Sequence, residues 1–232
     1  MRDLSGILLS YVYFFGLRLL ASLFKEHSEL GRKFFHILSG NWWFIVLFFF
    51  STVWTASVVP LSCICIYFLM KRKSAGFLLP GRLLSGLERA HAQETYGIVL
   101  YPMGMLLLVI LSFAVLKAPY VGGLGLMALA YGDGFAALAG KKYRYGRFTI
   151  WGNQKTLSGC AGMFIATSLS ITIYLFLTNN IIFPVHIFLL VVALLAFAAT
   201  LFEAITPAGF DNITIPLSVV GSYWVIAKLY LG

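Results

Sequence analysis

Long apolar runs alternate with short polar loops along almost the whole chain. Eight of these runs reach the roughly 17 to 25 residues that a membrane-spanning helix needs. The expected spans are Leu4–Phe24, Phe34–Phe50, Thr52–Met70, Gly97–Leu116, Pro119–Gly140, Leu157–Leu177, Ile181–Phe202 and Ile213–Leu231. The pattern predicts an all-α, polytopic integral membrane bundle of about eight transmembrane helices, within a range of seven to nine. We expect one membrane-embedded domain over residues 1–232.

The composition supports a membrane protein. The chain is 60% hydrophobic and 11% charged, whereas soluble domains carry about 25% charged residues. In a soluble protein, the formal net charge of +9 would suggest a nucleic-acid partner. Here the basic residues lie in loops between apolar runs, so we expect contacts with membrane lipids and no nucleic acid. Anionic nucleotides and phosphates are a second use of the same charge.

The positions of the basic residues predict the topology. Of the 17 Lys and Arg residues, 13 fall in loops that an eight-helix arrangement places on one side of the membrane. The loops on the other side are short and almost free of charge. Cytoplasmic loops are enriched in Lys and Arg, so the basic side is expected to be cytoplasmic and both termini outside.

An aspartate lies inside the fifth expected span. Asp133 stands between Gly132 and Gly134, and carboxylates inside spans usually face a polar cavity or a partner because their insertion is costly. Glycine allows a ligand to approach the backbone closely. We favour Asp133 as a ligand for a divalent cation. The alternative is a helix-packing face of small residues with Asp133 paired to a lysine.

A second polar segment leads directly into the sixth span. Lys155 and Thr156 precede Leu157, where free backbone N–H groups and the positive end of the helix dipole suit phosphate oxygens. Lys155 adds a point charge and Thr156 a hydroxyl. An ordinary N-cap at Thr156, beside a basic flanking residue, is an equally good interpretation.

A third polar segment follows the seventh span. Glu203, Asp211 and Asn212 flank a Pro–Gly turn. Carboxylate and amide oxygens suit magnesium, which usually keeps waters and bridges phosphates. We favour a magnesium site over the alternative of a capped loop in which Asp211 or Asn212 begins the last span.

A fourth segment precedes the second span. Arg32, Lys33 and His36 occupy neighbouring positions of one helix, because residues three and four apart lie on the same face. They could bind a phosphate or a lipid head group. A basic cytoplasmic anchor with a buried, neutral histidine explains them equally well.

Taken together, the four segments resemble the polyprenol kinase family, which includes dolichol kinase, phytol kinase and the CTP-using diacylglycerol kinase of yeast. Phosphatidate cytidylyltransferase is a more distant likeness. The matching pieces, in order, are Arg32-Lys33-x-x-His36, Gly132-Asp133-Gly134 with Gly140-Lys141, Lys155-Thr156-x-x-Gly159, and Glu203 followed by Asp211-Asn212-x-Thr214-x-Pro216. The chain differs from many members at Ser158, where they have an acid, and at Cys160, where they have a serine.

The resemblance implies Mg²⁺-dependent phosphoryl transfer from CTP or ATP to a membrane-embedded lipid alcohol. Asp133 and Asp211 would bind the metal, with Glu203 and Asn212 supporting that site. Lys155 and Lys141 would contact the phosphates. Arg32, Lys33, His36, Gly132, Gly134, Thr156 and Gly159 would complete the nucleotide and phosphate site.

The sequence leaves several properties open. The acceptor could be phytol or farnesol, a polyprenol or dolichol, or diacylglycerol, and the oligomeric state is also open, a homodimer included. Two other functions remain to be compared: a cytidylyltransferase that makes a CDP-lipid, and a membrane transporter or scaffold. The compact chain suggests a bacterial plasma membrane, with the catalytic face toward the cytoplasm.

Overall fold

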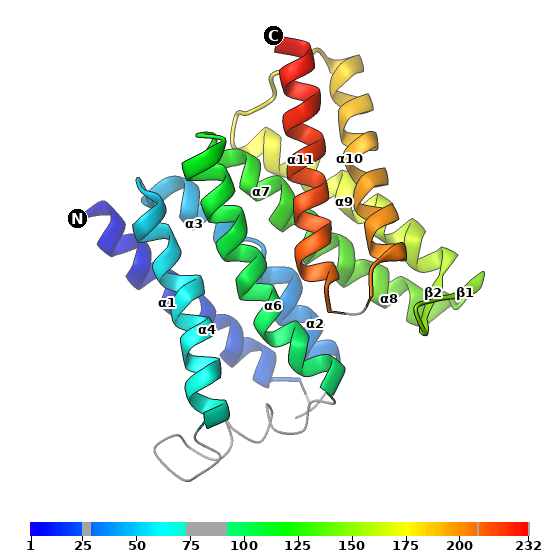
Figure 1. Ribbon diagram of the computed structural model, residues 1–232, viewed down its shortest axis with the longest axis horizontal. Helices are drawn as coiled ribbons and strands as arrows, with labels where there is room; N and C mark the ends of the chain where they lie inside the picture. The colour runs from blue at the N-terminus through cyan, green and yellow to red at the C-terminus, as the bar shows by residue number, and fades with distance from the viewer. Residues whose placement is uncertain (25–28, 73–91, 208, 232) are drawn as a thin grey trace.

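A computed structural model describes residues 1–24, 29–72, 92–207 and 209–231. Within these ranges the protein is a bundle of helices with one two-stranded hairpin (Figure 1). Five helical segments in the described part are long and apolar enough to cross a membrane, and the stretches Val53–Leu69 and Val99–Val115 form shorter apolar helices. The expected helical membrane bundle is therefore confirmed.

The described residues form these helices and strands. In chain order they are α1 (Arg2–Ser22), α2 (Glu29–Ser39), α3 (Trp42–Phe49), α4 (Val53–Arg72), α6 (Ala92–Val109), a π-helical segment (Ile110–Val115), α7 (Pro119–Met127), a second π-helical segment (Ala128–Asp133), α8 (Gly134–Tyr143), β1 (Arg147–Ile150), β2 (Asn153–Thr156), α9 (Leu157–Leu177), α10 (Val185–Ile205) and α11 (Asp211–Leu231). The second of the two π-helical segments is called the π segment below.

The expected span Phe34–Phe50 is not one continuous helix. The chain forms α2 and α3 instead, separated by a turn at Gly40 and Asn41. A Cβ at Gly40 would lie 2.6 Å from the Cβ of Ala130, so only glycine allows the turn to approach the π segment this closely. The break makes α2 a short helix whose residues 33 and 36 face the centre of the bundle, as the contacts below show.

The connections divide between two ends of the bundle. The α3–α4, α6–α7 and α9–α10 connections lie at the upper end in Figure 1, and the α8–β1 connection, the end of α10 and the start of α11 lie in the lower half. This division matches the alternation expected from the basic residues. The residues Lys25, Lys73, Arg82 and Arg89, which contribute to that expectation, lie outside the described part of the chain.

The continuous helical stretch from α7 through α8 forms the centre of the bundle. Of an 18-residue apolar stretch in this helix, 72% is buried inside the protein, against 22–33% of the corresponding stretches in the other four long spans. Glycines on α7 allow bulky neighbours to approach. A Cβ at Gly122 or Gly123 would collide with Trp43, and one at Gly125 would lie 2.8 Å from the Pro216 carbonyl oxygen. Asp133, at the end of the π segment, is therefore surrounded by other helices.

A two-stranded hairpin between α8 and α9 is the only β structure in the described residues, and the sequence-based prediction of an all-α protein did not include it. Strands β1 and β2 pair antiparallel, with Ile150 opposite Asn153. Trp151 and Gly152 form the two-residue turn, and both have positive φ. The hairpin projects beside the lower end of α10 (Figure 1).

Candidate active site

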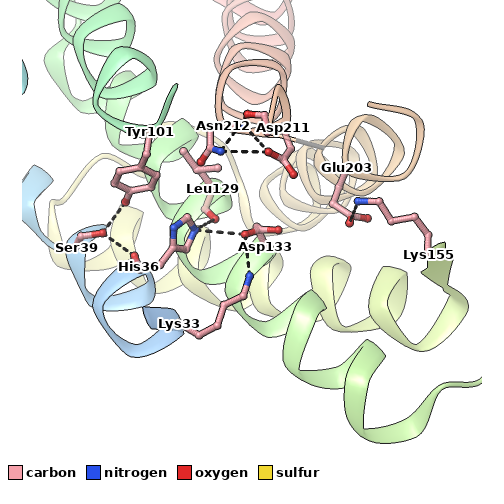
Figure 2. A network of polar contacts seen from close by, with 11 residues as sticks. Lys33, His36, Ser39, Tyr101, Leu129, Asp133, Lys155, Glu203, Asp211 and Asn212 are labelled. Carbon is pink, nitrogen blue, oxygen red and sulfur yellow. Dashed lines mark hydrogen bonds and ion pairs between the residues drawn. The ribbon is translucent and has the colours of Figure 1, made fainter. Parts of the chain in front are cut away.

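Polar side chains from five elements meet at one end of the bundle. They come from α2, the π segment, β2, α10 and the start of α11, and Figure 2 shows them around Asp133. Segments far apart in the sequence therefore contribute to one region, as the sequence-based hypothesis requires.

Asp133 is paired with two basic side chains of α2. Its Oδ2 atom lies 3.5 Å from Lys33 Nζ and 3.4 Å from His36 Nε2. About a fifth of each of these side chains is exposed to solvent, so the cluster is largely but not fully enclosed. Lys155 also interacts electrostatically with Asp133. Burying a carboxylate is costly unless cations and hydrogen bonds accompany it, and this cluster supplies cations.

The His36 ring is held by neighbours on α6 and on the π segment. Its Nε2 lies 3.2 Å from the carbonyl oxygen of Leu129, and the ring centroid is 4.7 Å from that of Tyr101 on α6. The Tyr101 hydroxyl in turn shares a 2.7 Å hydrogen bond with Ser39. Because these partners come from α2, α6 and the π segment, His36 links three elements at the site.

Glu203 and Lys155 form an ion pair between α10 and β2. The Glu203 side chain is 8% exposed and that of Lys155 16% exposed. A buried carboxylate of this kind is tolerated because the ammonium group lies directly beside it. The pair joins the hairpin to the end of α10.

Asp211 begins α11 close to the other acids. Its Oδ1 accepts hydrogen bonds from the backbone N–H of Asn212 at 2.9 Å and from the Asn212 side-chain amide at 3.2 Å. The carboxylate interacts electrostatically with Asp133, Lys155 and Glu203. The three expected metal-binding acids thus lie near enough to influence one another.

The glycines on either side of Asp133 permit close packing. A Cβ at Gly132 would lie 2.4 Å from Thr167 Oγ1 on α9, and one at Gly134 would lie 2.3 Å from Ile37 Cγ1 on α2. The sequence left open whether this segment is a packing face or a functional site. The structure agrees with both interpretations, because the glycines pack closely against other helices and Asp133 lines a polar pocket. The glycines bring α9 and α2 close, and Asp133 is thereby placed against Lys33 and His36.

Thr156 is the N-cap of α9. Its hydroxyl oxygen accepts a 2.9 Å hydrogen bond from the backbone N–H of Gly159. The same oxygen would lie 2.8 Å from a Cβ at Gly140, so α8 approaches the start of α9 closely here. Of the two interpretations of Thr156, the N-cap is therefore present in the structure, and the residue also lines the pocket described next.

A polar pocket of about 570 Å³ opens beside Asp133. It lies between α8, the hairpin, the start of α9 and the end of α10. Its lining residues are Asp133, Ala136, Ala137, Gly140, Lys141, Arg144, Arg147, Asn153, Gln154, Lys155, Thr156, Gly159 and Glu203. Four cationic side chains and two amides in one cavity suit a polyanionic ligand of nucleotide size.

Not every expected residue lies in this pocket. Asp133, Lys141, Lys155, Thr156, Gly159 and Glu203 line it, whereas Asp211, Asn212, Arg32, Lys33, His36, Gly132 and Gly134 do not. Lys33 and His36 pair with Asp133, and Arg32 interacts electrostatically with His36. The expected residues therefore form the pocket wall and a supporting cluster behind Asp133.

Several residues of the site were not predicted from the sequence. Arg144, Arg147, Asn153 and Gln154 line the pocket, and the Tyr101 ring packs at a tilt against the His36 ring. The four pocket residues lie after α8 in the sequence. The alternation of polar and apolar residues from Arg147 to Ile150 is a local pattern that is typical of a strand. The hairpin is hard to predict from its turn, because two-residue turns of this kind usually contain Asn–Gly or Asp–Gly rather than Trp–Gly.

The acids suit a magnesium ion that arrives with a nucleotide. Among the described residues, no group of three His, Cys, Asp or Glu side chains is placed to hold a metal alone. Magnesium, however, is commonly bound by one or two carboxylates together with substrate phosphates. Asp133 and Asp211, which interact electrostatically, are the carboxylates that would hold such an ion.

An apolar groove of about 870 Å³ runs along α9 on the opposite face of α8. Phe135, Leu138 and Lys142 line the groove, whereas Ala137 and Lys141 line the polar pocket. At 100° per residue these two sets lie on opposite sides of the helix. Helix α8 therefore separates the groove from Asp133.

Comparison with known proteins identifies the family. The chain is 30% identical to the phytol kinase of Synechocystis sp. over 220 residues, which cover 92% of this chain and 86% of that protein. No family model matches the chain, and no solved structure matches it. On this similarity, the chain belongs to the polyprenol kinase family, together with phytol kinase.

Proposed function

We propose that this protein is a lipid-alcohol kinase that transfers the γ-phosphoryl group of a nucleoside triphosphate, with CTP as the expected donor, to an isoprenoid alcohol of the phytol class. The reaction takes place at the cytoplasmic face of a bacterial plasma membrane. The relative's name, phytol kinase, supports the choice of reaction and of acceptor. The distribution of basic loops supports the choice of membrane face.

The observation that carries the proposal is the polar pocket beside Asp133. Its wall combines the cations Lys141, Arg144, Arg147 and Lys155 with the acids Asp133 and Glu203. Phosphoryl transfer depends on positioning and on neutralising phosphate charge rather than on covalent catalysis. A pocket with both signs of charge at the end of a membrane bundle suits that task.

The chemical step that we propose is a direct displacement. The alcohol oxygen attacks the γ-phosphorus, and the bond between that phosphorus and the β–γ bridging oxygen breaks, which releases the nucleoside diphosphate. The hydroxyl proton passes to Asp133 or Glu203, the two carboxylates that line the pocket. The cations of the pocket stabilise the charge on the departing phosphate oxygens.

Asp133 and Asp211 are proposed to hold Mg²⁺ together with the triphosphate. The ion supplies charge neutralisation and orientation of the phosphates when it is bound. Lys33 and His36 hold the Asp133 carboxylate in place from the side away from the pocket. Removal of divalent cations should therefore abolish transfer, and Mg²⁺ should restore it.

The test is a screen of donors against acceptors. Purified protein in lipid nanodiscs with Mg²⁺ is given CTP or ATP and, separately, phytol, farnesol, a polyprenol, dolichol or diacylglycerol. Mass spectrometry identifies the products. The proposal predicts a lipid monophosphate and CDP, with the highest kcat/KM for phytol or farnesol.

Other products would identify other functions. A CDP-lipid with pyrophosphate, formed from a lipid phosphate, would show a cytidylyltransferase. Solute flux in proteoliposomes without nucleotide, together with no phosphorylated lipid, would show a transporter. Either result contradicts the proposed kinase activity.

A further inference from the structure

The hairpin forms one wall of the polar pocket and is fastened to α10 at two points. Arg147 of β1 and Asn153, Gln154 and Lys155 of β2 line the pocket. One fastening is the ion pair of Lys155 with Glu203. The other is at the tip, where the indole N–H of Trp151 donates a 2.9 Å hydrogen bond to the carbonyl oxygen of Ile205.

The acceptor of this bond is a group that the helix leaves unpaired. Ile205 is the last residue of α10, and the last four carbonyl groups of an α-helix have no partner within the helix. The indole therefore caps α10 from outside while it holds the hairpin. Residues 151 and 205 are 54 positions apart in the sequence, so the bond joins two elements that have no short connection.

Trp151 occupies a backbone position that does not suit a bulky residue. Its φ is 51°, and that of Gly152 is 76°. A two-residue turn with two positive φ angles favours Asn–Gly or Asp–Gly, and a bulky residue in this region is an outlier. The side chain is 74% exposed, so burial does not compensate for the strain. The indole instead contacts α10 through its hydrogen bond to Ile205.

We propose that Trp151 is a positioning residue that fixes the hairpin against α10 and thereby sets the affinity of the polar pocket for a nucleoside triphosphate. This inference rests on the proposed function in taking the triphosphate as the ligand of the pocket. Without the Trp151 contact, the tip of the hairpin is released and Arg147, Asn153 and Gln154 lose their fixed distance from α8. Ordering the hairpin then opposes binding.

Two substitutions separate the contact from the turn. Trp151→Phe keeps an aromatic ring but removes the N–H donor. Trp151→Asn removes the ring and places a residue that the turn prefers, so the hairpin still forms. Trp54→Phe is the matched control, because Trp54 is 81% exposed and lies on α4, which contributes no residue to the pocket.

The measurement is the equilibrium binding of CTP and of ATP, with Mg²⁺, to the purified full chain in nanodiscs. Loss of one hydrogen bond changes an equilibrium by roughly five-fold. We expect the Kd of both Trp151 variants to rise by about that factor for the nucleotide that the wild type binds. In the kinase assay, the KM for the triphosphate should rise while kcat and the KM for the alcohol stay unchanged.

Limited trypsin digestion gives a readout that does not depend on activity. Arg144 and Arg147 are both exposed and flank the start of the hairpin. Both variants should be cut there faster than the wild type, and bound triphosphate should slow the cleavage. The thermal midpoint of the whole protein should not change, because Trp151 is exposed.

The outcomes distinguish the two proposals. If the wild type binds neither triphosphate, the proposed function fails. If the wild type binds and both Trp151 variants bind equally well, the positioning role of Trp151 is overturned and the kinase proposal stands. An indole at a membrane surface can also act as an interfacial anchor. A lowered thermal midpoint with unchanged nucleotide affinity would show that role instead.

Discussion

At the scale of single residues, each of the two acids that line the pocket has a basic neighbour. Asp133 contacts Lys33 and His36, and Glu203 contacts Lys155. A buried charge without a partner is costly. The pairs allow several ionised groups to lie beside one pocket. Preorganised charges of this kind can stabilise the negative charge of a bound triphosphate.

The Lys155–Glu203 pair allows stability and activity to be separated. Lys155→Met should destabilise the protein by roughly 3–5 kcal/mol, because it leaves a buried carboxylate without its cation. The double variant Lys155→Met with Glu203→Gln should recover most of that stability, since no buried charge remains. Both variants should be inactive. Thermal unfolding in nanodiscs and the kinase assay measure the two effects separately.

Recovery of activity in the double variant would contradict a role for Lys155 in contacting phosphate. Equal destabilisation by the single and the double variant would contradict the coupling between the two side chains.

At the scale of elements, glycines determine how closely the helices approach the site. A Cβ at Gly104 on α6 would lie 2.3 Å from the carbonyl oxygen of Asn212, a backbone atom at the start of α11. Asp211 is the neighbouring residue. The separation of α6 and α11 therefore sets the position of one expected metal ligand.

Gly104→Ala should push the start of α11 away from α6. We expect a loss of about 1–3 kcal/mol of stability, as is typical of overpacking, and a higher Mg²⁺ requirement because Asp211 moves. Gly221→Ala, on α11, is the control, since nothing lies within 4 Å of its added Cβ. Gly221→Ala should neither lower the stability nor raise the Mg²⁺ requirement. If Gly104→Ala has the same Mg²⁺ requirement as the wild type, the assignment of Asp211 as a metal ligand is contradicted.

The sequence predicted some elements well because their signals are local. The span Leu157–Leu177 has the bounds of α9, since Thr156 caps its start and a polar loop follows its end. The break at Gly40 and Asn41 was not predicted, because a lone glycine in an apolar run is equally compatible with a continuous span. The π segment depends on how α2 and α9 pack around it, and no local pattern indicates that packing.

The site was predictable in part for the same reason. The alternation of basic loops placed Asp133, Lys155, Glu203 and Asp211 at one end of the bundle, and they lie there. The partners of Asp133 were not predictable. Lys33 and His36 were expected at a phosphate, and their contact with Asp133 depends on the rotation of α2, which packs through Ile37 against Gly134. The metal and phosphate roles remain predictions.

At the scale of the whole molecule, polar chemistry and connections are distributed unevenly between the two ends. One end carries the hairpin and the polar pocket. The other carries the α3–α4, α6–α7 and α9–α10 connections (Figure 1). A water-soluble nucleotide and a membrane-bound alcohol can meet only at a membrane surface, and the end with the pocket provides that surface.

Cysteine labelling tests this orientation. In a variant without Cys63, Cys65 and Cys160, single cysteines are introduced by Ser51→Cys or Thr149→Cys, at positions that are exposed in the structure. A thiol reagent that does not cross membranes should label position 51 in intact bacterial cells and position 149 only after lysis. The reverse pattern would place the pocket outside the cell and remove its access to cytoplasmic CTP.

The most direct test of the central claim is the transfer of label from [γ-³²P]CTP to phytol in the presence of Mg²⁺. The wild type should form labelled phytyl phosphate, and Asp133→Asn should lower the rate at least about 10²-fold, as the loss of an electrostatic catalytic group does. Asp3→Asn, the same change at an aspartate that accepts hydrogen bonds from Ser51 and Thr55 at the other end of the bundle, should keep the rate. Full transfer by Asp133→Asn would contradict the assignment of this site.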